Sequence, residues 1–276
     1  MFADYHVHTE FSDDSVYPME QVIADAAAMH MDEICITDHV DYGIKEDWDC
    51  RKEIQYRNGE PLANVDYPRY MKKIRDLQSQ YQGKITIRTG LEFGVQTHTI
   101  PQYEALYSQY DFDFIILSIH QVEDKEFWTQ DFQRGRSQRE YNKRYYEEML
   151  SVIKNFHHYS VLGHMDLLKR YDLAGIWPFE EARPFIEEIL KQVIADGQGI
   201  EINTSARRYG LTDTCPSRQI LSLYRDLGGT ILTIGSDSHK PEHLGADIEE
   251  TKAYLKELGF THFCTYEKMR PTFHEL

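Results

Sequence analysis

Short runs of apolar and β-branched residues alternate along the chain with longer stretches in which apolar residues recur at helical spacing. The short runs predict seven strands, at residues 2–7, 33–37, 85–91, 112–119, 160–163, 199–203 and 230–234. The longer stretches predict seven helices, at residues 18–30, 67–81, 101–109, 138–157, 179–196, 216–227 and 249–258. A further apolar run at residues 261–266 predicts one more short strand near the C-terminus.

Strands that alternate with helices throughout the chain indicate an α/β fold with a parallel sheet. The composition shows no break along the 276 residues, so we expect residues 1–276 to form a single domain. A closed or nearly closed barrel and an open, doubly wound sheet both fit this order of elements. An open sheet feeds its binding crevice from only a few strands, whereas candidate ligands end nearly every strand here. This distribution favours a TIM-like barrel with its site at the C-terminal ends of the strands.

Imidazole and carboxylate side chains follow most of the predicted strands, and these groups are the usual ligands of first-row divalent metals. His6 and His8 are two residues apart at the end of the first strand, so both imidazoles point to the same side. Asp237 and His239 repeat this spacing after the last strand of the barrel. The remaining candidate ligands are Asp14, His39, Glu92, His120 and His164.

Each of these residues also has a structural interpretation. Buried histidines often only satisfy hydrogen bonds in a core, and Asp14 could cap the helix that starts near residue 18. Asp38 could orient a histidine from outside the ligand set. Glu92 could lie in a surface turn, although glycines at positions 90 and 94 would let the backbone approach a crowded centre. Two same-face pairs at opposite ends of the chain favour the metal site.

The composition limits the partners of this protein. A formal net charge of -16 argues against binding to nucleic acid, while bound metals and a few arginines would still admit a small anionic substrate. No apolar run approaches the roughly 20 residues of a membrane helix, so we expect no membrane partner. The first strand begins at residue 2, which leaves no room for a signal peptide, and the four cysteines are widely spaced. We therefore expect free thiols and a cytoplasmic location, and assembly into a homo-oligomer stays open.

Two long loops interrupt the alternation of strands and helices, at residues 40–66 and 120–137. Both follow candidate ligands directly, and long loops in compact domains usually have a function. We expect them to overhang the site as lids or as walls for the substrate.

These motifs resemble the PHP (polymerase and histidinol phosphatase) superfamily of metal-dependent phosphoesterases. The first motif is His6-Val7-His8-Thr9, the second is Thr37-Asp38-His39, the third is Glu92 and the fourth is Asp237-Ser238-His239. The resemblance extends from residue 4 to about residue 245. Within the superfamily, the segments at residues 118–120, 163–170 and 201–208 are most similar to the monofunctional histidinol-phosphate phosphatases.

The resemblance implies a distorted (β/α)7 TIM-like barrel that holds three divalent transition metals, which would be Zn, Fe or Mn. The implied ligands are His6, His8, Glu92 and Asp237 for one metal, Glu92, His120 and His164 for the second, and Asp14, His39 and His239 for the third. The implied reaction hydrolyses L-histidinol phosphate to L-histidinol and phosphate in histidine biosynthesis, by attack of a metal-bound hydroxide. Another phosphoesterase of the same superfamily, acting on a sugar or nucleotide phosphate, is the alternative.

The phosphate group of such a substrate needs a positive clamp beside the metals. Candidate residues for substrate binding are Arg170, Arg207, Arg208, Asn203 and Ser205. Glu92 and Asp237 are expected to take part in catalysis, and Asp166 is a candidate general acid. A non-catalytic metal-binding module and an amide or lactone hydrolase are further alternatives. The full set of nine ligand-like residues and the paired Asp-x-His motif favour the phosphatase.

Overall fold

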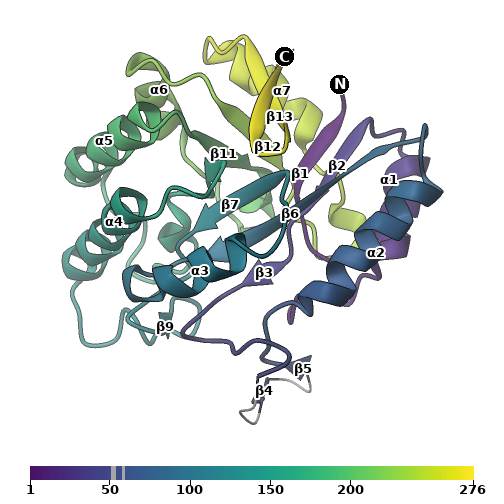
Figure 1. Ribbon diagram of the computed structural model, residues 1–276. Coiled ribbons are helices and arrows are strands. Elements are labelled where there is room, and N and C mark those ends of the chain that lie inside the picture. The colour runs from purple at the N-terminus through teal and green to yellow at the C-terminus, as the bar shows by residue number, and fades with distance from the viewer. Residues whose placement is uncertain (51–53, 58–59) are drawn as a thin grey trace.

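The computed structural model describes residues 1–50, 54–57 and 60–276 of the chain (Figure 1). Its main sheet is parallel, with strands in the order β1-β2-β6-β7-β10-β11-β12. The bounds are Ala3–Val7 (β1), Glu33–Ile36 (β2), Thr86–Gly94 (β6), Phe114–Ser118 (β7), Val161–Leu162 (β10), Gly199–Asn203 (β11) and Leu232–Gly235 (β12). A two-residue strand, β3 (His39–Val40), pairs with β6 beside this path.

The first and last strands of this sheet meet. Val7 at the end of β1 forms a parallel bridge to Ser238, just past β12, and the His8 amide donates to the Ser238 carbonyl oxygen at 2.8 Å. The sheet is therefore nearly closed into the predicted seven-stranded barrel, and the open doubly wound sheet is wrong.

Helices alternate with these strands and lie around the outside of the sheet in Figure 1. Each predicted helix is present, with ends that differ by a few residues. Their bounds are Met19–Ala28 (α1), Tyr67–Gln80 (α2), Ile100–Tyr107 (α3), Gln138–Asn155 (α4), Phe179–Ala195 (α5), Arg218–Asp226 (α6) and Ile248–Glu257 (α7).

The burial pattern explains why the chain folds in this way. All five residues of β7 are buried, as expected for a parallel strand with side chains packed against both of its faces. Helix α5 buries Ile186, Ile189 and Val193 at helical spacing and exposes its polar side. Fully burying one such side chain contributes about 1.5–3 kcal/mol. The packed core thus holds the strands in place, and the strands in turn position the side chains at their carboxyl ends.

A C-terminal hairpin packs against the end of the barrel at which the strands begin. The predicted strand at residues 261–266 is present as β13 (His262–Glu267), and it pairs with an antiparallel strand, β14 (Arg270–Glu275), that the sequence pattern did not predict. The Tyr266 hydroxyl donates to the Ser160 carbonyl oxygen, just before β10, and the Met269 amide donates to the Asp113 carbonyl oxygen, just before β7. The hairpin therefore covers the ends where strands begin and leaves the opposite ends free.

The two long loops each contain a small hairpin. One is formed by β4 (Tyr56–Arg57) and β5 (Glu60–Pro61), and the other by β8 (Gln121–Val122) and β9 (Lys125–Glu126). Residues 51–53 and 58–59 of the first loop lie outside the described residues. Cys35, Cys215 and Cys264 are buried free thiols, as predicted. In the described ranges, no helix has both the length and the apolar character needed to cross a membrane.

Candidate metal centre

Glu92 lies at the middle of a cluster of histidines at the carboxyl ends of the strands. Its Oε2 atom is 3.1 Å from His6 Nε2 and 3.0 Å from His39 Nδ1. Its Oε1 atom is 3.0 Å from His120 Nε2 and 2.8 Å from His164 Nε2. A single buried carboxylate thus faces imidazoles from four different strand ends, which is the arrangement expected of a bridging ligand.

The other predicted ligands join the same cluster. His8 Nε2 lies 3.5 Å from both Glu92 Oε2 and Asp237 Oδ1. His239 Nδ1 is 3.6 Å from Asp237 Oδ1, and His239 Nε2 is 3.1 Å from Asp14 Oδ2. The structure therefore brings all nine predicted ligands together, six imidazoles and three carboxylates.

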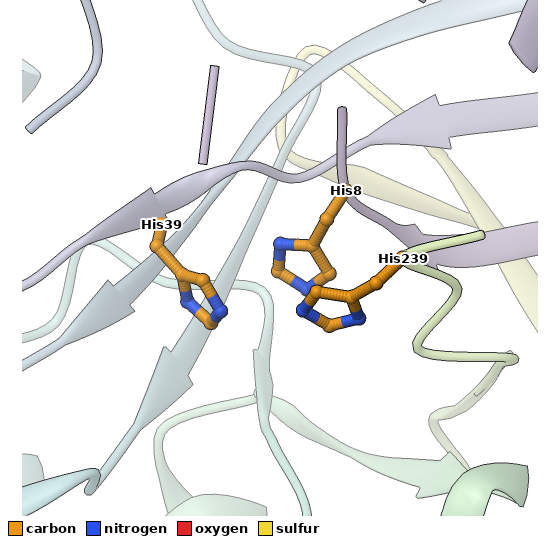
Figure 2. A group of neighbouring side chains, drawn as sticks. All are labelled: His8, His39 and His239. Atoms are coloured by element: carbon orange, nitrogen blue, oxygen red, sulfur yellow. The ribbon is translucent and has the colours of Figure 1, made fainter. Parts of the chain in front are cut away.

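The imidazole of His8 stacks on those of His39 and His239, although the three residues come from distant parts of the chain. Figure 2 shows His8, from the end of β1, with its ring between those of His39 in β3 and His239 after β12. The ring centroid of His8 is 4.2 Å from that of His39 and 4.1 Å from that of His239. Closure of the barrel is what places these three rings side by side.

Glycines at the strand ends make room for this crowding. A Cβ atom on Gly94 would lie 1.9 Å from Asp41 Oδ1 and 2.9 Å from His120 Nδ1. A Cβ atom on Gly235 would lie 2.3 Å from the Cβ atom of His6. The absence of a side chain at these positions is thus required by the packing of the site, as expected of the glycine beside Glu92.

The unpaired atoms of the cluster fit a metal centre. His6 Nε2, His8 Nε2, His39 Nδ1 and Glu92 Oε2 are buried and have no hydrogen-bond partner among the described residues. Buried polar atoms are nearly always hydrogen-bonded, so four that converge without partners require an explanation. Three sets offer ligand atoms within 4.8 Å of one another and include only predicted ligands: His6, His8 and Asp237; His6, Glu92 and His164; His8, His39 and His239. Nitrogen and carboxylate donors in such sets suit divalent transition metals.

Two guanidinium groups border the cluster on the side of Asp237. Arg170 Nη1 is 3.7 Å from Asp237 Oδ2, and Arg170 Nη2 donates to Ser205 Oγ at 2.7 Å. Arg208 Nη2 donates to the carbonyl oxygens of Ser236 at 2.6 Å and Asp237 at 2.9 Å. Arg170 Nε and Arg208 Nη1 are buried and have no hydrogen-bond partner in the described part of the chain. Asn203 accepts a hydrogen bond from the amide of Ser205, the residue that Arg170 contacts.

The side-chain contacts of two other predicted site residues, Arg207 and Asp166, are with residues outside the predicted ligand set. Arg207 is 62% exposed and faces Asp247, at 3.9 Å, so its side chain does not join those of Arg170 and Arg208. Both oxygens of Asp166 have protein partners, because Oδ1 accepts from the Cys215 thiol while Oδ2 accepts from the Ser217 amide and from Lys169 Nζ. Asp166 thus forms hydrogen bonds to both neighbouring and distant segments of the chain, which is typical of a structural role.

Comparison with known proteins agrees with the geometry of the centre. A family model described as PHP domain matches residues 4–205. The chain belongs to the PHP family. The histidinol-phosphatase of Lactococcus lactis subsp. lactis is 28% identical over 270 residues, which cover 97% of this chain and 95% of that protein. A probable histidinol-phosphatase of Clostridium acetobutylicum is 28% identical over 254 residues, which cover 90% and 91%.

Solved structures of PHP-like proteins show the same fold. The crystal structure of the Lactococcus lactis histidinol phosphate phosphatase, complexed with zinc, L-histidinol and phosphate, matches with a TM-score of 0.83 at 28% identity and covers 98% of each chain. A putative histidinol phosphatase from Listeria monocytogenes matches with a TM-score of 0.71 at 20% identity, over 90% of this chain and 99% of that one.

In this PHP domain, several histidines of the predicted ligand set contact carboxylates outside that set, directly or through a hydroxyl group. Glu201, in β11, binds His6 Nδ1, and Asp41 Oδ1 lies 2.8 Å from His120 Nδ1. Asp38 accepts a hydrogen bond from Ser12, whose hydroxyl is 3.2 Å from His8 Nδ1. Such a role was expected for Asp38, whereas Glu201 and Asp41 were not predicted. A carboxylate between two isoleucines of a buried strand was the signal for Glu201.

The charged groups of the cluster shift one another's pKa values. Burial alone would raise the pKa of Glu92, but the imidazoles of His6 and His120 hold that pKa well below its usual range. Burial and the neighbouring imidazoles lower the pKa of His8 well below its ordinary value. Burial would also lower the pKa of His120, but Glu92 and Asp41 raise it to about 9. Metals bind neutral imidazole, so a metal bound at His120 would have to displace a proton from that ring at neutral pH.

Proposed function

We propose that this protein hydrolyses L-histidinol phosphate to L-histidinol and inorganic phosphate at a multinuclear metal centre. The observation that carries the proposal is the convergence of unpaired ligand atoms on Glu92, next to Arg170 and Arg208, which each have one buried guanidinium nitrogen without a hydrogen-bond partner among the described residues. Relatives named histidinol-phosphatase, and a similar structure that contains zinc, L-histidinol and phosphate, support this substrate.

We propose that the centre holds three metals, zinc being one that fits its donors. The first would be bound by His6, His8, Glu92 and Asp237, the second by Glu92, His120 and His164, and the third by Asp14, His39 and His239. The distances from Glu92 to four imidazoles support its role as the shared ligand. Divalent metals in such a centre supply Lewis acidity for the phosphoryl group and lower the pKa of water towards neutrality.

The side chains around the centre would bind the phosphate and orient it. Arg170 and Arg208 each have a guanidinium nitrogen without a partner in the described residues, so both can donate to phosphate oxygens. Ser205 donates to Asp237 Oδ2 at 3.0 Å and accepts from Arg170, which fixes both groups relative to one another. The guanidinium carbon of Arg170 lies 3.9 Å from the ring centroid of Tyr209, a contact that restricts its rotamers.

The test is phosphate release from L-histidinol phosphate, measured beside a panel of sugar and nucleotide phosphates on protein of known metal content. We expect the kcat/KM for L-histidinol phosphate to exceed that of every other ester, with about three metals per chain. His39→Ala should abolish turnover after metal reloading. The matched control is His157→Ala, because His157 is 55% exposed and lies outside the cluster. This variant should keep the turnover of the wild type.

Two outcomes would change the proposal. Preferred turnover of another phosphomonoester would keep the metal phosphatase and replace the substrate. A well-folded protein that binds no divalent metal would overturn the centre itself. We also propose a cytoplasmic location, which the free thiols of Cys35, Cys215 and Cys264 and relatives named histidinol-phosphatase support.

A further inference from the structure

Lys45, in the long loop that follows β3, carries a buried ammonium group between two carboxylates. Its Nζ atom is 2.9 Å from Asp41 Oδ2 and 2.5 Å from Asp13 Oδ1, and only 6% of its side chain is exposed. Lysine is almost never buried unless it is paired. Asp41 contacts His120, and Asp13 precedes Asp14 in the chain, so both partners of Lys45 adjoin predicted metal ligands.

The two oxygens of Asp41 have separate tasks. Oδ1 accepts from His120 Nδ1 at 2.8 Å, which keeps the proton on Nδ1 and leaves Nε2 free to face Glu92 Oε1 at 3.0 Å. Oδ2 faces Lys45. The Asp41 amide donates to the Asn64 side chain at 2.9 Å, which fixes the backbone from the far end of the same loop.

Asp41 is also close enough to the cluster to act as a ligand itself. Asp41, His39 and His120 offer ligand atoms within 4.8 Å of one another. A carboxylate that turned towards a metal would leave His120 without its partner. Lys45 opposes this change because it binds the second oxygen of Asp41 and balances its charge.

We propose that Lys45 is a positioning residue of the metal centre: it holds Asp41 against His120 and thereby sets the affinity for the metal that His120 binds. This gives the described part of the 40–66 loop a role in metal retention. The inference rests on the proposed function only in requiring a metal centre, and it does not depend on the substrate.

The experiment compares metal binding in Lys45→Met and in the wild type. Metal-free protein is titrated with Zn²⁺ against a chromophoric chelator, and with Co²⁺ while its absorption spectrum is recorded. We expect one metal equivalent to bind about 10–100-fold more weakly in Lys45→Met, with a changed Co²⁺ spectrum, and the others to bind as before. Lys45→Arg keeps the charge and should restore most of the affinity.

Lys252→Met is the matched control. Lys252 is as buried as Lys45, at 7% exposure for each residue, but it lies on α7 and donates to the Met1 carbonyl oxygen at 2.6 Å. Its replacement should lower thermal stability and leave both metal titrations unchanged, which separates a positioning role from a purely structural one.

Wild-type affinities and a wild-type Co²⁺ spectrum in folded Lys45→Met would overturn the inference. If that variant does not fold, Asp41→Asn, which is nearly isosteric, is judged by the same criterion. A wild-type protein that binds no metal would overturn the proposed function as well. Weak turnover of L-histidinol phosphate together with the expected loss of one metal equivalent would support the inference and count only against the substrate.

Discussion

Glu201 is a fully buried carboxylate in β11, and the polar groups that contact it are hydrogen-bond donors. It accepts from the Nδ1 atom of His6, from the backbone amide of His164 at 2.9 Å and from Asn203 Nδ2 at 3.4 Å. The substitution Glu201→Gln keeps the shape of the side chain and replaces one accepting oxygen by a donating NH₂ group. That group must then face either the His164 amide or the imidazole of His6.

Both orientations of the new amide are unfavourable. Against the His164 amide, two buried donors face each other, and an unsatisfied buried donor costs about 1–3 kcal/mol. Against His6, the imidazole must accept at Nδ1, so its proton moves to Nε2, the atom that faces Glu92 at 3.1 Å. A protonated Nε2 cannot bind a metal. We therefore expect metal affinity to fall about 10–100-fold, which corresponds to about 1.4–2.7 kcal/mol of binding free energy.

The assay is a titration of metal-free protein with Zn²⁺ against a chromophoric chelator, followed by phosphate release at saturating metal. Glu148→Gln is the control, because Glu148 is also a buried carboxylate that accepts from a backbone amide, that of Thr97 at 2.6 Å, but it lies on α4. A folded Glu201→Gln protein with the metal affinities of the wild type would refute the argument that Glu201 sets the tautomer of His6.

Three further results are expected. Arg208→Ala should raise the inhibition constant of inorganic phosphate at least about tenfold, because hydrogen bonds to charged groups are worth about 1.5–3 kcal/mol. Arg207→Ala is the control and should leave this constant unchanged. An unchanged constant in Arg208→Ala would show that Arg208 does not bind the phosphate. Gly94→Ala places a methyl group 1.9 Å from Asp41 Oδ1 and should weaken metal binding in a chelator titration, so wild-type affinity would contradict the packing argument. Metal-free protein should lose thermal stability as the pH rises from about 6.5 to about 9, since the raised pKa of His120, about 9, stabilises the fold only while that imidazole is protonated. A flat stability profile after chelation would count against this coupling.

The convergence of the candidate ligands could be predicted because most of them obey a local rule. His6 and His8 are separated by two residues, which fixes both on one side of a strand, and Glu92 follows an apolar run between two glycines. In a parallel barrel all strand ends point to one mouth, so knowledge of where each strand ends was enough to place eight of the nine residues together, while Asp14 lies in the loop between β1 and α1.

Other features depend on contacts that no local pattern encodes. Arg207 and Arg208 are neighbours in a short 3₁₀ helix, Thr204–Tyr209, and only the turn of that helix decides which guanidinium faces the centre. Asp41 becomes a partner of His120 because two loops 79 residues apart meet at the mouth. Strand β14 is largely exposed and mixes polar with apolar residues, so its pairing with β13 leaves little hydrophobic signal.

Four of the carboxylates that contribute to the negative net charge of this protein are buried within its fold. Glu92, Asp237, Asp41 and Glu201 are all at least 92% buried at the mouth of the barrel, and a buried charge is tolerated only when it is compensated. Among the described residues, lysine and arginine side chains form ion pairs with two of the four, through Lys45 with Asp41 and Arg170 with Asp237. Protonated imidazoles can balance the rest in the metal-free protein, but metal ligation displaces those protons and puts divalent charge in their place. Part of the formal net charge of -16 therefore comes from buried carboxylates whose charge bound cations would neutralise. Metal binding should then stabilise the folded state as well as support catalysis.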